Sequence, residues 1–321
     1  MCALYGFYDL NSVLPPKVKK KLLRSLSCES EIRGHDATGI AYISESELRI
    51  FKVGKPAHKV KLYVPDKTRV VMGHDRATTH GLASRNQNNH PFRGHIQSLD
   101  FALAHNGLLW DQAYLRKKYA LPDSEIETDS YVAVQMIEKS GRLDIESLKE
   151  IAENIEGSFA FTILDSDGRL IFIKKDCPIS IAFFDELCLY VYASTSDILH
   201  KALVRCGLGG LKPKMINLEC GDIFVIHGDG DTEQGKFKTY DFRSWVPLSY
   251  LCRPYESSIT LHELLDLGRI AGVDERDIQT LLELYTVAEV EEFIDDPKLL
   301  QKELRSISGG CWNDDDWGLY E

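Results

Sequence analysis

Residues 159–193 read FAFTILDSDGRLIFIKKDCPISIAFFDELCLYVYA, and this stretch decides the fold class. It contains successive runs rich in β-branched and aromatic residues, which are typical of strands: Phe159–Leu164, Leu170–Lys174, Ile179–Phe184 and Leu187–Ala193. Short turns with Asp, Gly or Pro separate these runs. Strands in adjacent groups, without strict β-α-β alternation, predict antiparallel sheets.

The same pattern continues on both sides of this stretch. Further runs predict strands at Cys2–Tyr8, Gly39–Ile43, Leu48–Lys52, Arg69–His74, Ser98–His105 and Asp222–His227. Helices are predicted at Pro16–Ser27, Trp110–Tyr119, Asp129–Ser140 with Thr128 as its N-cap, Ile145–Ile155 and Ser196–Arg205. We therefore expect an α+β fold in which helices cover antiparallel sheets.

The chain changes character after Asp241. Apolar residues three and four apart predict consecutive short helices at Leu261–Ile270, Glu275–Tyr285, Val287–Ile294 and Lys298–Ser306. Pro254 and the residues after it mark a linker. We expect two domains, residues 2–245 and an acidic helical extension at residues 255–321.

Charge and composition exclude several classes of protein. Residues 251–321 contain 6 Lys and Arg against 17 Asp and Glu, which equals the whole net charge of −11. Phosphate binding depends on Lys and Arg, so we expect no nucleic-acid partner. No apolar run approaches the ~20 residues that span a bilayer, and no signal peptide is evident, so we expect no membrane association. The eight cysteines form no C-x-x-C pair, which favours a reducing cytoplasm.

Two motif matches are better explained by ordinary structure. Histidines gather between His74 and His105, but they lack a zinc-ligand spacing, so we expect no metal site. Residues 230–236 fit G-x-x-x-x-G-K, yet Phe237 stands where a hydroxyl residue would reach magnesium. The segment joins strand-like runs and precedes no helix, so we interpret it as a hairpin. No cofactor is expected.

Three polar, glycine-flanked motifs carry side chains that catalysis can use, at residues 33–39, 73–81 and 104–108. Arg76 can bind a carboxylate through two parallel hydrogen bonds. Asn106 can donate its side-chain amide and Gly107 its backbone N–H, as in an oxyanion hole. Asp129 can offer a carboxylate, or can be a favourable charge at a helix start.

Cys2 supplies the nucleophile that these motifs lack. Methionine removal is expected where the second residue is as small as cysteine. It would leave a thiol with a pKa of ~8.5 and an α-amine with a pKa of ~7.7–8.0 on one residue. The amine can then serve as the base for the thiol.

In their order and spacing the motifs resemble the glutaminase domain of class II glutamine amidotransferases, a group of N-terminal nucleophile hydrolases. The matching segments are Cys2, R-G-H-D-A-T-G-I, G-H-D-R-A-T-T-H-G, H-P-F, A-H-N-G-L, E-T-D-S and E-G-S-F-A. Among such domains the sequence is most similar to the glutaminase half of glucosamine-6-phosphate synthase, over roughly residues 2–240. The resemblance implies a four-layer α/β/β/α sandwich of two antiparallel sheets.

The resemblance also implies roles for individual residues. Cys2 would be the nucleophile, and Asn106 with Gly107 the oxyanion hole. Arg76 would hold the glutamine α-carboxylate, helped by Thr79 and His80, and Asp129 would pair with the α-ammonium. Two positions depart from the family pattern. Ala3 stands where glycine is usual, and Ala77 replaces a bulky aromatic that helps to close the site and guide ammonia.

About eighty residues follow the glutaminase-like region, fewer than the ~100–200 of a usual acceptor domain. We therefore expect a glutaminase that hydrolyses L-glutamine and supplies ammonia to a separate synthase subunit. The acidic extension is either a docking surface or a solvated cap. Two alternatives are a hydrolase of another γ-glutamyl amide and a catalytically inactive glutamine-binding sensor or scaffold.

Overall fold

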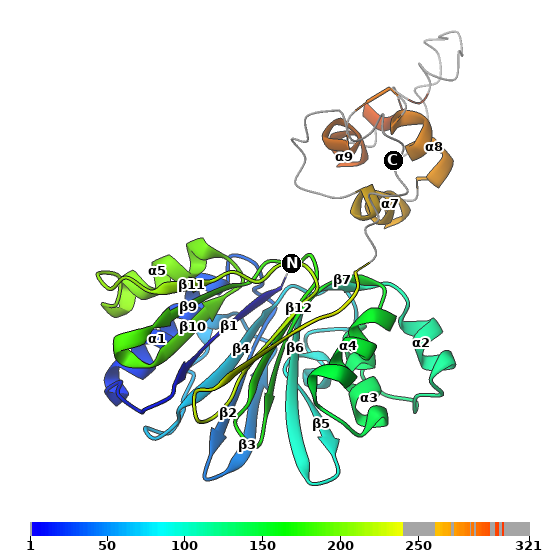
Figure 1. The fold of residues 1–321 in the computed structure, drawn as a ribbon. Helices are drawn as coiled ribbons and strands as arrows, with labels where there is room; N and C mark the ends of the chain where they lie inside the picture. Colours follow the sequence, from blue (N-terminus) through cyan, green and yellow to red (C-terminus); the bar gives the residue numbers. More distant parts are fainter. Residues whose placement is uncertain are drawn as a thin grey trace. The chain divides into compact units, whose positions relative to one another are not determined.

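The computed structural model describes residues 2–239, 261–270, 273–282, 284–285, 287–295, 299–301 and 304. The chain divides into two compact units, Met1–Tyr240 and Asp241–Glu321. Each unit has its own hydrophobic core. Figure 1 shows the helices and strands of both.

Within residues 2–239, one antiparallel sheet has the strand order β11-β9-β10-β1-β4-β2-β3. Its strands are β1 (Ala3–Asp9), β2 (Ala37–Ser44), β3 (Glu47–Val53), β4 (Val70–Arg76), β9 (Ser180–Phe184), β10 (Leu189–Ala193) and β11 (Lys214–Ile216). The second antiparallel sheet has the order β13-β12-β8-β7-β6-β5. Its strands are β5 (Phe92–Ile96), β6 (Leu99–Leu109), β7 (Gly157–Asp165), β8 (Leu170–Lys174), β12 (Asp222–Ile226) and β13 (Thr232–Lys236).

Helices cover the outer face of each sheet. On the first sheet, α1 (Pro16–Ser30) and α5 (Ser196–Cys206) share a core cluster with β1 and β10. On the second sheet, α2 (Gln112–Lys118), α3 (Tyr131–Ser140) and α4 (Ile145–Asn154) share a cluster with β6 and β7. Short 3₁₀ helices occur at η1 (Ala57–Lys59), η2 (Asn86–Asn88) and η3 (Asp185–Leu187).

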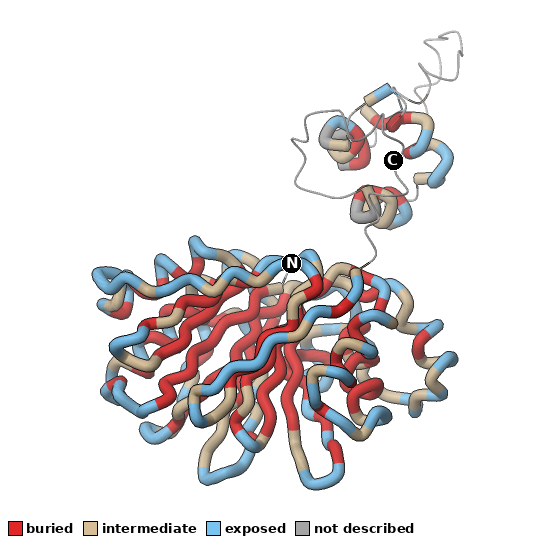
Figure 2. The backbone as a smooth tube through the Cα atoms, in the orientation of Figure 1, coloured by how far each residue is buried: buried red, intermediate tan, exposed pale blue. Residues whose placement is uncertain are grey.

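The two sheets pack face to face through a third cluster. Leu4 and Met72 contribute to it from the first sheet, and Ala104 and Ala160 from the second. Successive strand residues point to opposite faces, so Tyr5, next to Leu4, packs instead under the outer helices. Figure 2 shows the strands as largely buried. The expected α+β sandwich of two antiparallel sheets between helical layers is confirmed.

Several local expectations need correction. β5, β11 and β13 were not predicted, because their short segments carry exposed polar residues. Thr128 is not a helix cap: α3 begins at Tyr131, and the Thr128 hydroxyl donates to the carbonyl of Asn88. By contrast, the interpretation of residues 230–236 as a hairpin is confirmed, since they complete the turn after β12 and form β13. β6 runs on to Leu109, so Asn106 and Gly107 lie inside a paired strand.

The described part of the second unit is a group of short helices, α7 (Leu261–Ile270), α8 (Glu275–Leu282) and α9 (Val287–Asp295). Leu264, Ile278 and Phe293 are among the residues of its core. The linker at Pro254 lies outside the described residues, and residues 298–306 are described only in part. In the described part of the chain, no helix is both long and apolar enough to cross a membrane.

Candidate functional site

The pairing of β1 with β4 places Cys2 and Arg76 at the same end of the first sheet. Ala3 pairs with Asp75, so Cys2, one residue earlier, comes opposite Arg76, which ends β4. Cys2 shares the face of Leu4, which packs between the sheets. The Cys2 Sγ lies 3.4 Å from the carbonyl oxygen of Ala77.

Burial raises the pKa of the Cys2 thiol, whereas the positive charge of Arg76 lowers it and the negative charge of Asp129 raises it. A raised pKa keeps the thiol protonated near neutral pH. The thiolate is the nucleophile, so a thiol at this position needs a base to react.

Arg76 is a buried cation whose hydrogen-bond acceptors are all neutral. Its side chain is 1% exposed. Nη1 donates to Asn89 Oδ1 at 2.8 Å, and Nη2 donates to the carbonyl of Gly81 at 3.0 Å and to the carbonyl of His80. Nη2 also lies 3.4 Å from Thr128 Oγ1. Among the described residues, no carboxylate forms an ion pair with Arg76. A buried guanidinium with only neutral partners is suited to receive an anion.

Asp129 is a buried carboxylate two residues before Tyr131, where α3 begins. Its Oδ2 accepts a hydrogen bond from the Leu109 N–H at 2.7 Å, and Ser130 Oγ lies 3.3 Å from Oδ1. Its negative charge acts on both Cys2 and Arg76. The structure therefore brings one cation and one anion beside the thiol without joining them directly.

Asn106 points into the region between the sheets. It shares the face of Ala104, and it is 1% exposed. Neither the Nδ2 nor the Oδ1 of Asn106 has a hydrogen-bond partner in the described part of the chain. Buried amides are normally paired, so an unpaired one points to a partner that binds there.

Gly107 has a backbone conformation that favours glycine, with φ at +139°. A Cβ here would lie 1.9 Å from the Ser158 carbonyl oxygen. Phe159 of β7 lies opposite Gly107. The Phe159 carbonyl accepts from the Lys175 N–H, and the Phe159 N–H donates to Asp176 Oδ1, so both backbone groups of Phe159 point toward β8. This pair therefore exchanges no hydrogen bond between β6 and β7, and the Gly107 N–H is directed away from β7.

Thr79 and His80 lie differently from the other predicted site residues. Their side chains are exposed, and it is the backbone carbonyl of His80 that contacts Arg76. Cys2, Arg76 and Asp129, in contrast, lie close enough together for their charges to act on one another. His74 on β4 holds β6 at the residue before Asn106, through a 2.9 Å hydrogen bond to the His105 carbonyl.

Three of the histidines that gather between His74 and His105 in the sequence form a buried group. The rings of His74 and His90 are 4.2 Å apart, and those of His90 and His105 are 6.4 Å apart. Burial lowers the pKa of all three, that of His74 to about 3. They are therefore neutral at physiological pH. Among the described residues, no group of His, Cys, Asp and Glu has a metal-binding arrangement.

Three further residues, Arg33, Asn89 and Ser130, contact the predicted site residues, and no role was predicted for them. Arg33 Nε donates to the Cys2 carbonyl at 3.0 Å, and Asn89 orients Arg76. Ser130 Oγ lies 2.6 Å from His105 Nδ1. For Arg33 the only signal was its place in the motif at residues 33–39, while partners such as Asn89 become visible only once the chain is folded.

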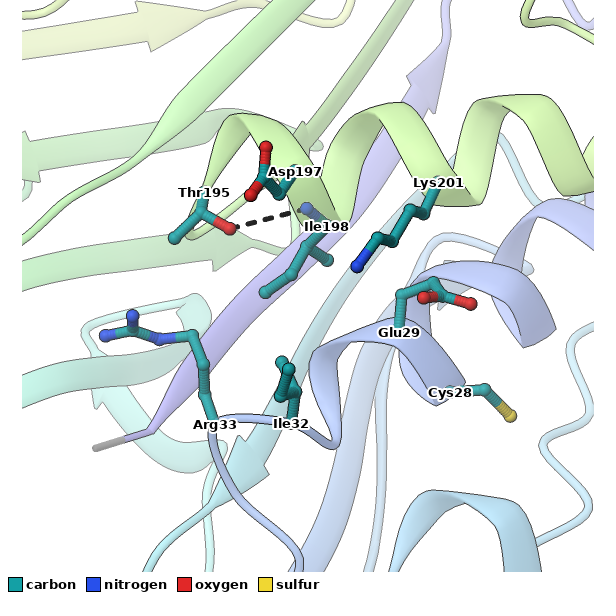
Figure 3. Close-up of a pocket in the computed structure, with 8 residues that line it drawn as sticks. All are labelled: Cys28, Glu29, Ile32, Arg33, Thr195, Asp197, Ile198 and Lys201. Carbon is teal, nitrogen blue, oxygen red and sulfur yellow. Dashed lines mark hydrogen bonds between the residues drawn. The ribbon is translucent and has the colours of Figure 1, made fainter.

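A cavity of about 460 Å³ opens between α1 and α5, on the helical side of the first sheet. Its lining residues are Cys28, Glu29, Ile32, Arg33, Thr195, Asp197, Ile198 and Lys201. Figure 3 shows the hydrogen bond from the Ile198 N–H to Thr195 Oγ1 that caps α5. None of the site residues predicted from the sequence lines this cavity, although Arg33 borders it and also contacts Cys2.

Comparisons with known proteins show which family part of the chain is similar to. Residues 74–200 match the model of a glutamine amidotransferase domain. The chain is 32% identical over 183 residues to glutamine–fructose-6-phosphate aminotransferase (isomerizing) of Geobacillus kaustophilus, covering 55% of this chain and 29% of that protein. It is 30% identical over 207 residues to 7-cyano-7-deazaguanine synthase of Sulfolobus acidocaldarius, covering 61% and 44%. The chain thus spans less than half the length of these relatives.

A solved structure shares the fold. Glutamine phosphoribosylpyrophosphate amidotransferase from B. subtilis, complexed with ADP and GMP, superposes with a TM-score of 0.55 at 20% identity. The superposition covers 84% of this chain and 58% of that one. At this identity the likeness concerns the fold alone.

Proposed function

Because the chain contains a class II glutamine amidotransferase domain, we propose that it hydrolyses L-glutamine to glutamate and ammonia with Cys2 as the nucleophile. The observation that carries this proposal is the pair of buried, opposite charges beside the thiol. Arg76 has only neutral acceptors, and Asp129 forms no direct ion pair with it in the described part of the chain. Free glutamine is a zwitterion, with one charge for each of them.

In this proposal, Arg76 binds the α-carboxylate and Asp129 the α-ammonium of the substrate. Thr79 and His80 lie on the exposed loop that follows Arg76, and we propose that they contact the carboxylate when glutamine is bound. The loop is held to Arg76 through the carbonyls of His80 and Gly81. Two charge-assisted contacts would orient the side-chain amide toward Cys2.

The chemistry follows from the groups at the site. The Cys2 α-amine, exposed by removal of Met1, takes the thiol proton, and the thiolate attacks the δ-carbonyl carbon of glutamine. The oxyanion that forms is stabilised by the Asn106 Nδ2–H and the Gly107 N–H. The ammonium of Cys2 then protonates the leaving nitrogen, which departs as ammonia and leaves a γ-glutamyl thioester. Water adds to the thioester, and glutamate and the free thiol are released.

We also propose that residues 2–245 form the glutaminase domain and residues 255–321 a separate extension. The ammonia would serve a synthase or amination reaction on another subunit. The names of the relatives, an aminotransferase and a synthase, support this class of acceptor. We expect the protein to work in the cytoplasm.

The test is release of glutamate and ammonia from L-glutamine, with glutamine binding measured by titration calorimetry in parallel. The wild-type protein should turn over, and Cys2→Ala should bind glutamine without turnover. Cys28→Ala is a matched control, because Cys28 lies on the cavity between α1 and α5. Binding without turnover by the wild type would favour a glutamine sensor.

A further inference from the structure

Asp129 is hydrogen-bonded to β6, the strand that carries the proposed oxyanion hole. Its Oδ2 accepts from Leu109 N–H at 2.7 Å, and its Oδ1 is 3.3 Å from Ser130 Oγ. Ser130 Oγ in turn lies 2.6 Å from the Nδ1 of His105. Both ends of this chain of contacts belong to β6, on either side of Asn106 and Gly107.

The three side chains of this chain of contacts are inaccessible to water. Ser130 is 1% exposed, and Asp129 and His105 are 2% exposed each. Buried polar contacts of this kind are stronger than exposed ones, because water does not compete for them. A substitution of Ser130 should therefore change how the Asp129 carboxylate is oriented.

The tautomer of His105 decides whether the Ser130 hydroxyl donates to His105 Nδ1 or to Asp129 Oδ1. The contact of 2.6 Å between Ser130 Oγ and His105 Nδ1 is short, whereas 3.3 Å to Asp129 Oδ1 is long for an O–H donor. His105 is neutral and carries one ring hydrogen, and its Nε2 and the Ser158 carbonyl both lie beside Gly107. With the ring hydrogen on Nε2, Nδ1 accepts the Ser130 hydroxyl hydrogen. Asp129 Oδ1 then keeps its acceptor capacity.

We propose that Ser130 and His105 are positioning residues for the α-ammonium group of glutamine. His105 Nδ1 accepts the Ser130 hydroxyl hydrogen and so fixes the position of Ser130 Oγ. The contact of Ser130 Oγ with Asp129 Oδ1 at 3.3 Å then limits rotation of the Asp129 carboxylate about its hydrogen bond from the Leu109 N–H. Oδ1 is thereby presented to the substrate in one direction. This inference rests on the proposed function and goes beyond it by naming the residues that orient the ammonium site.

Two substrates separate this role from a merely structural one. L-glutamine carries the α-ammonium, and glutaramate is the same molecule without it. Ser130→Ala should raise the KM for glutamine about tenfold, the effect of a weakened charge-assisted hydrogen bond. The kcat should change less than about threefold, and the KM for glutaramate should stay within about twofold, because Arg76 and Asn106 are untouched.

Ser130→Thr keeps the hydroxyl and should restore the KM for glutamine to within about threefold of wild type. Ser140→Ala, an exposed serine at the other end of α3, is the matched control. Thermal unfolding verifies that each variant is folded. Binding of both compounds to the same full-length variants is measured by titration calorimetry, which does not depend on turnover.

The outcomes distinguish the two proposals. A wild-type protein that binds glutamine but does not hydrolyse it would contradict the proposed hydrolysis, while the two-ligand comparison by calorimetry would still test Ser130. Equal loss of glutamine and glutaramate binding in Ser130→Ala, or no loss of either, would overturn the role of Ser130. A wild-type protein that binds neither compound would overturn both proposals.

Discussion

His74 donates a hydrogen bond from Nε2 to the carbonyl oxygen of His105 at 2.9 Å, and so ties β4 of one sheet to β6 of the other. The bond lies one residue before Asn106 and two residues before Arg76. Its donor is a neutral, buried imidazole, because burial lowers the pKa of His74 to about 3. The two strands that carry the proposed carboxylate site and oxyanion hole are thus linked by a titratable group.

This linkage predicts a stability that falls in mild acid. The pKa of His74 and of His90 is lower in the folded protein than the ~6.5 of an unfolded chain, so the unfolded state binds more protons. Stability is fully present above pH ~6.5 and falls below it, by roughly 1 kcal/mol per pH unit for each such histidine. Denaturant unfolding at several pH values between 5 and 7.5 measures the slope.

His90→Leu tests the same idea, because neither ring nitrogen of His90 has a hydrogen-bond partner in the described part of the chain. The variant should show a shallower slope, by roughly 1 kcal/mol per pH unit. His200→Gln, at an exposed position on α5, is the control. An unchanged slope in His90→Leu would show that this ring already binds a proton in the folded state.

Activity should require a free α-amine on Cys2. With Met1 retained, the nitrogen of Cys2 is an amide and cannot accept the thiol proton near neutral pH. General-base assistance contributes about 10²–10⁴-fold, and the unprocessed form should lose at least that much. A cleavable N-terminal fusion gives the free Cys2 or a form with one extra residue, verified by intact mass spectrometry. Equal turnover of the two forms would mean that the α-amine is not the base.

Asn106→Ala should separate activity from stability. Loss of one oxyanion-hole donor lowers kcat by about 10²–10³. The free energy of unfolding should change little, because the Asn106 amide has no partner in the described residues and its removal relieves a buried, unpaired group. Asn154→Ala, at the end of α4, is the control. A large loss of stability with little loss of kcat would contradict the assignment.

Arg76→Lys should lower kcat/KM for glutamine at least tenfold. A lysine ammonium cannot hold Asn89, Gly81 and a planar carboxylate at once, and a lost buried charge partner costs about 2–5 kcal/mol. Arg85→Lys, at an exposed arginine paired with Glu127, serves as the control.

Wild type should also prefer glutamine to N-acetylglutamine by at least tenfold, and equal kcat/KM for the two would refute the ammonium site.

Deletion of residues 251–321 should leave glutaminase turnover within about twofold of the full chain. Among the described residues, the core clusters of the first unit extend to Phe237 and the core cluster of the second unit begins at Leu264, so each unit is described with a core of its own. The deletion should weaken association with an acceptor enzyme, most visibly at low salt, because the removed segment is strongly acidic. An insoluble or inactive truncated protein would show that the two units depend on each other.

Local sequence patterns predicted most of the strands and helices and the chemical groups of the proposed site. Runs of β-branched and aromatic residues predicted β7 to β10 closely, and the helix predicted at Ser196–Arg205 is α5. These features are local, since they depend on residues within a few positions of each other. The motifs likewise supplied Cys2, Arg76, Asn106 and Asp129 as candidates before any contact was known.

The tertiary structure decided which groups meet and in what state. Asn106 lies inside β6 because β7 pairs with it as far as Leu109, and Thr128 bonds to Asn88 in place of capping α3. The link from His105 through Ser130 to Asp129 joins residues 25 apart. Such partners depend on how sheets and helices pack, and burial then sets the charge of each group by removing water. The periodicity of the sequence predicts neither which groups become partners nor which charge each of them carries.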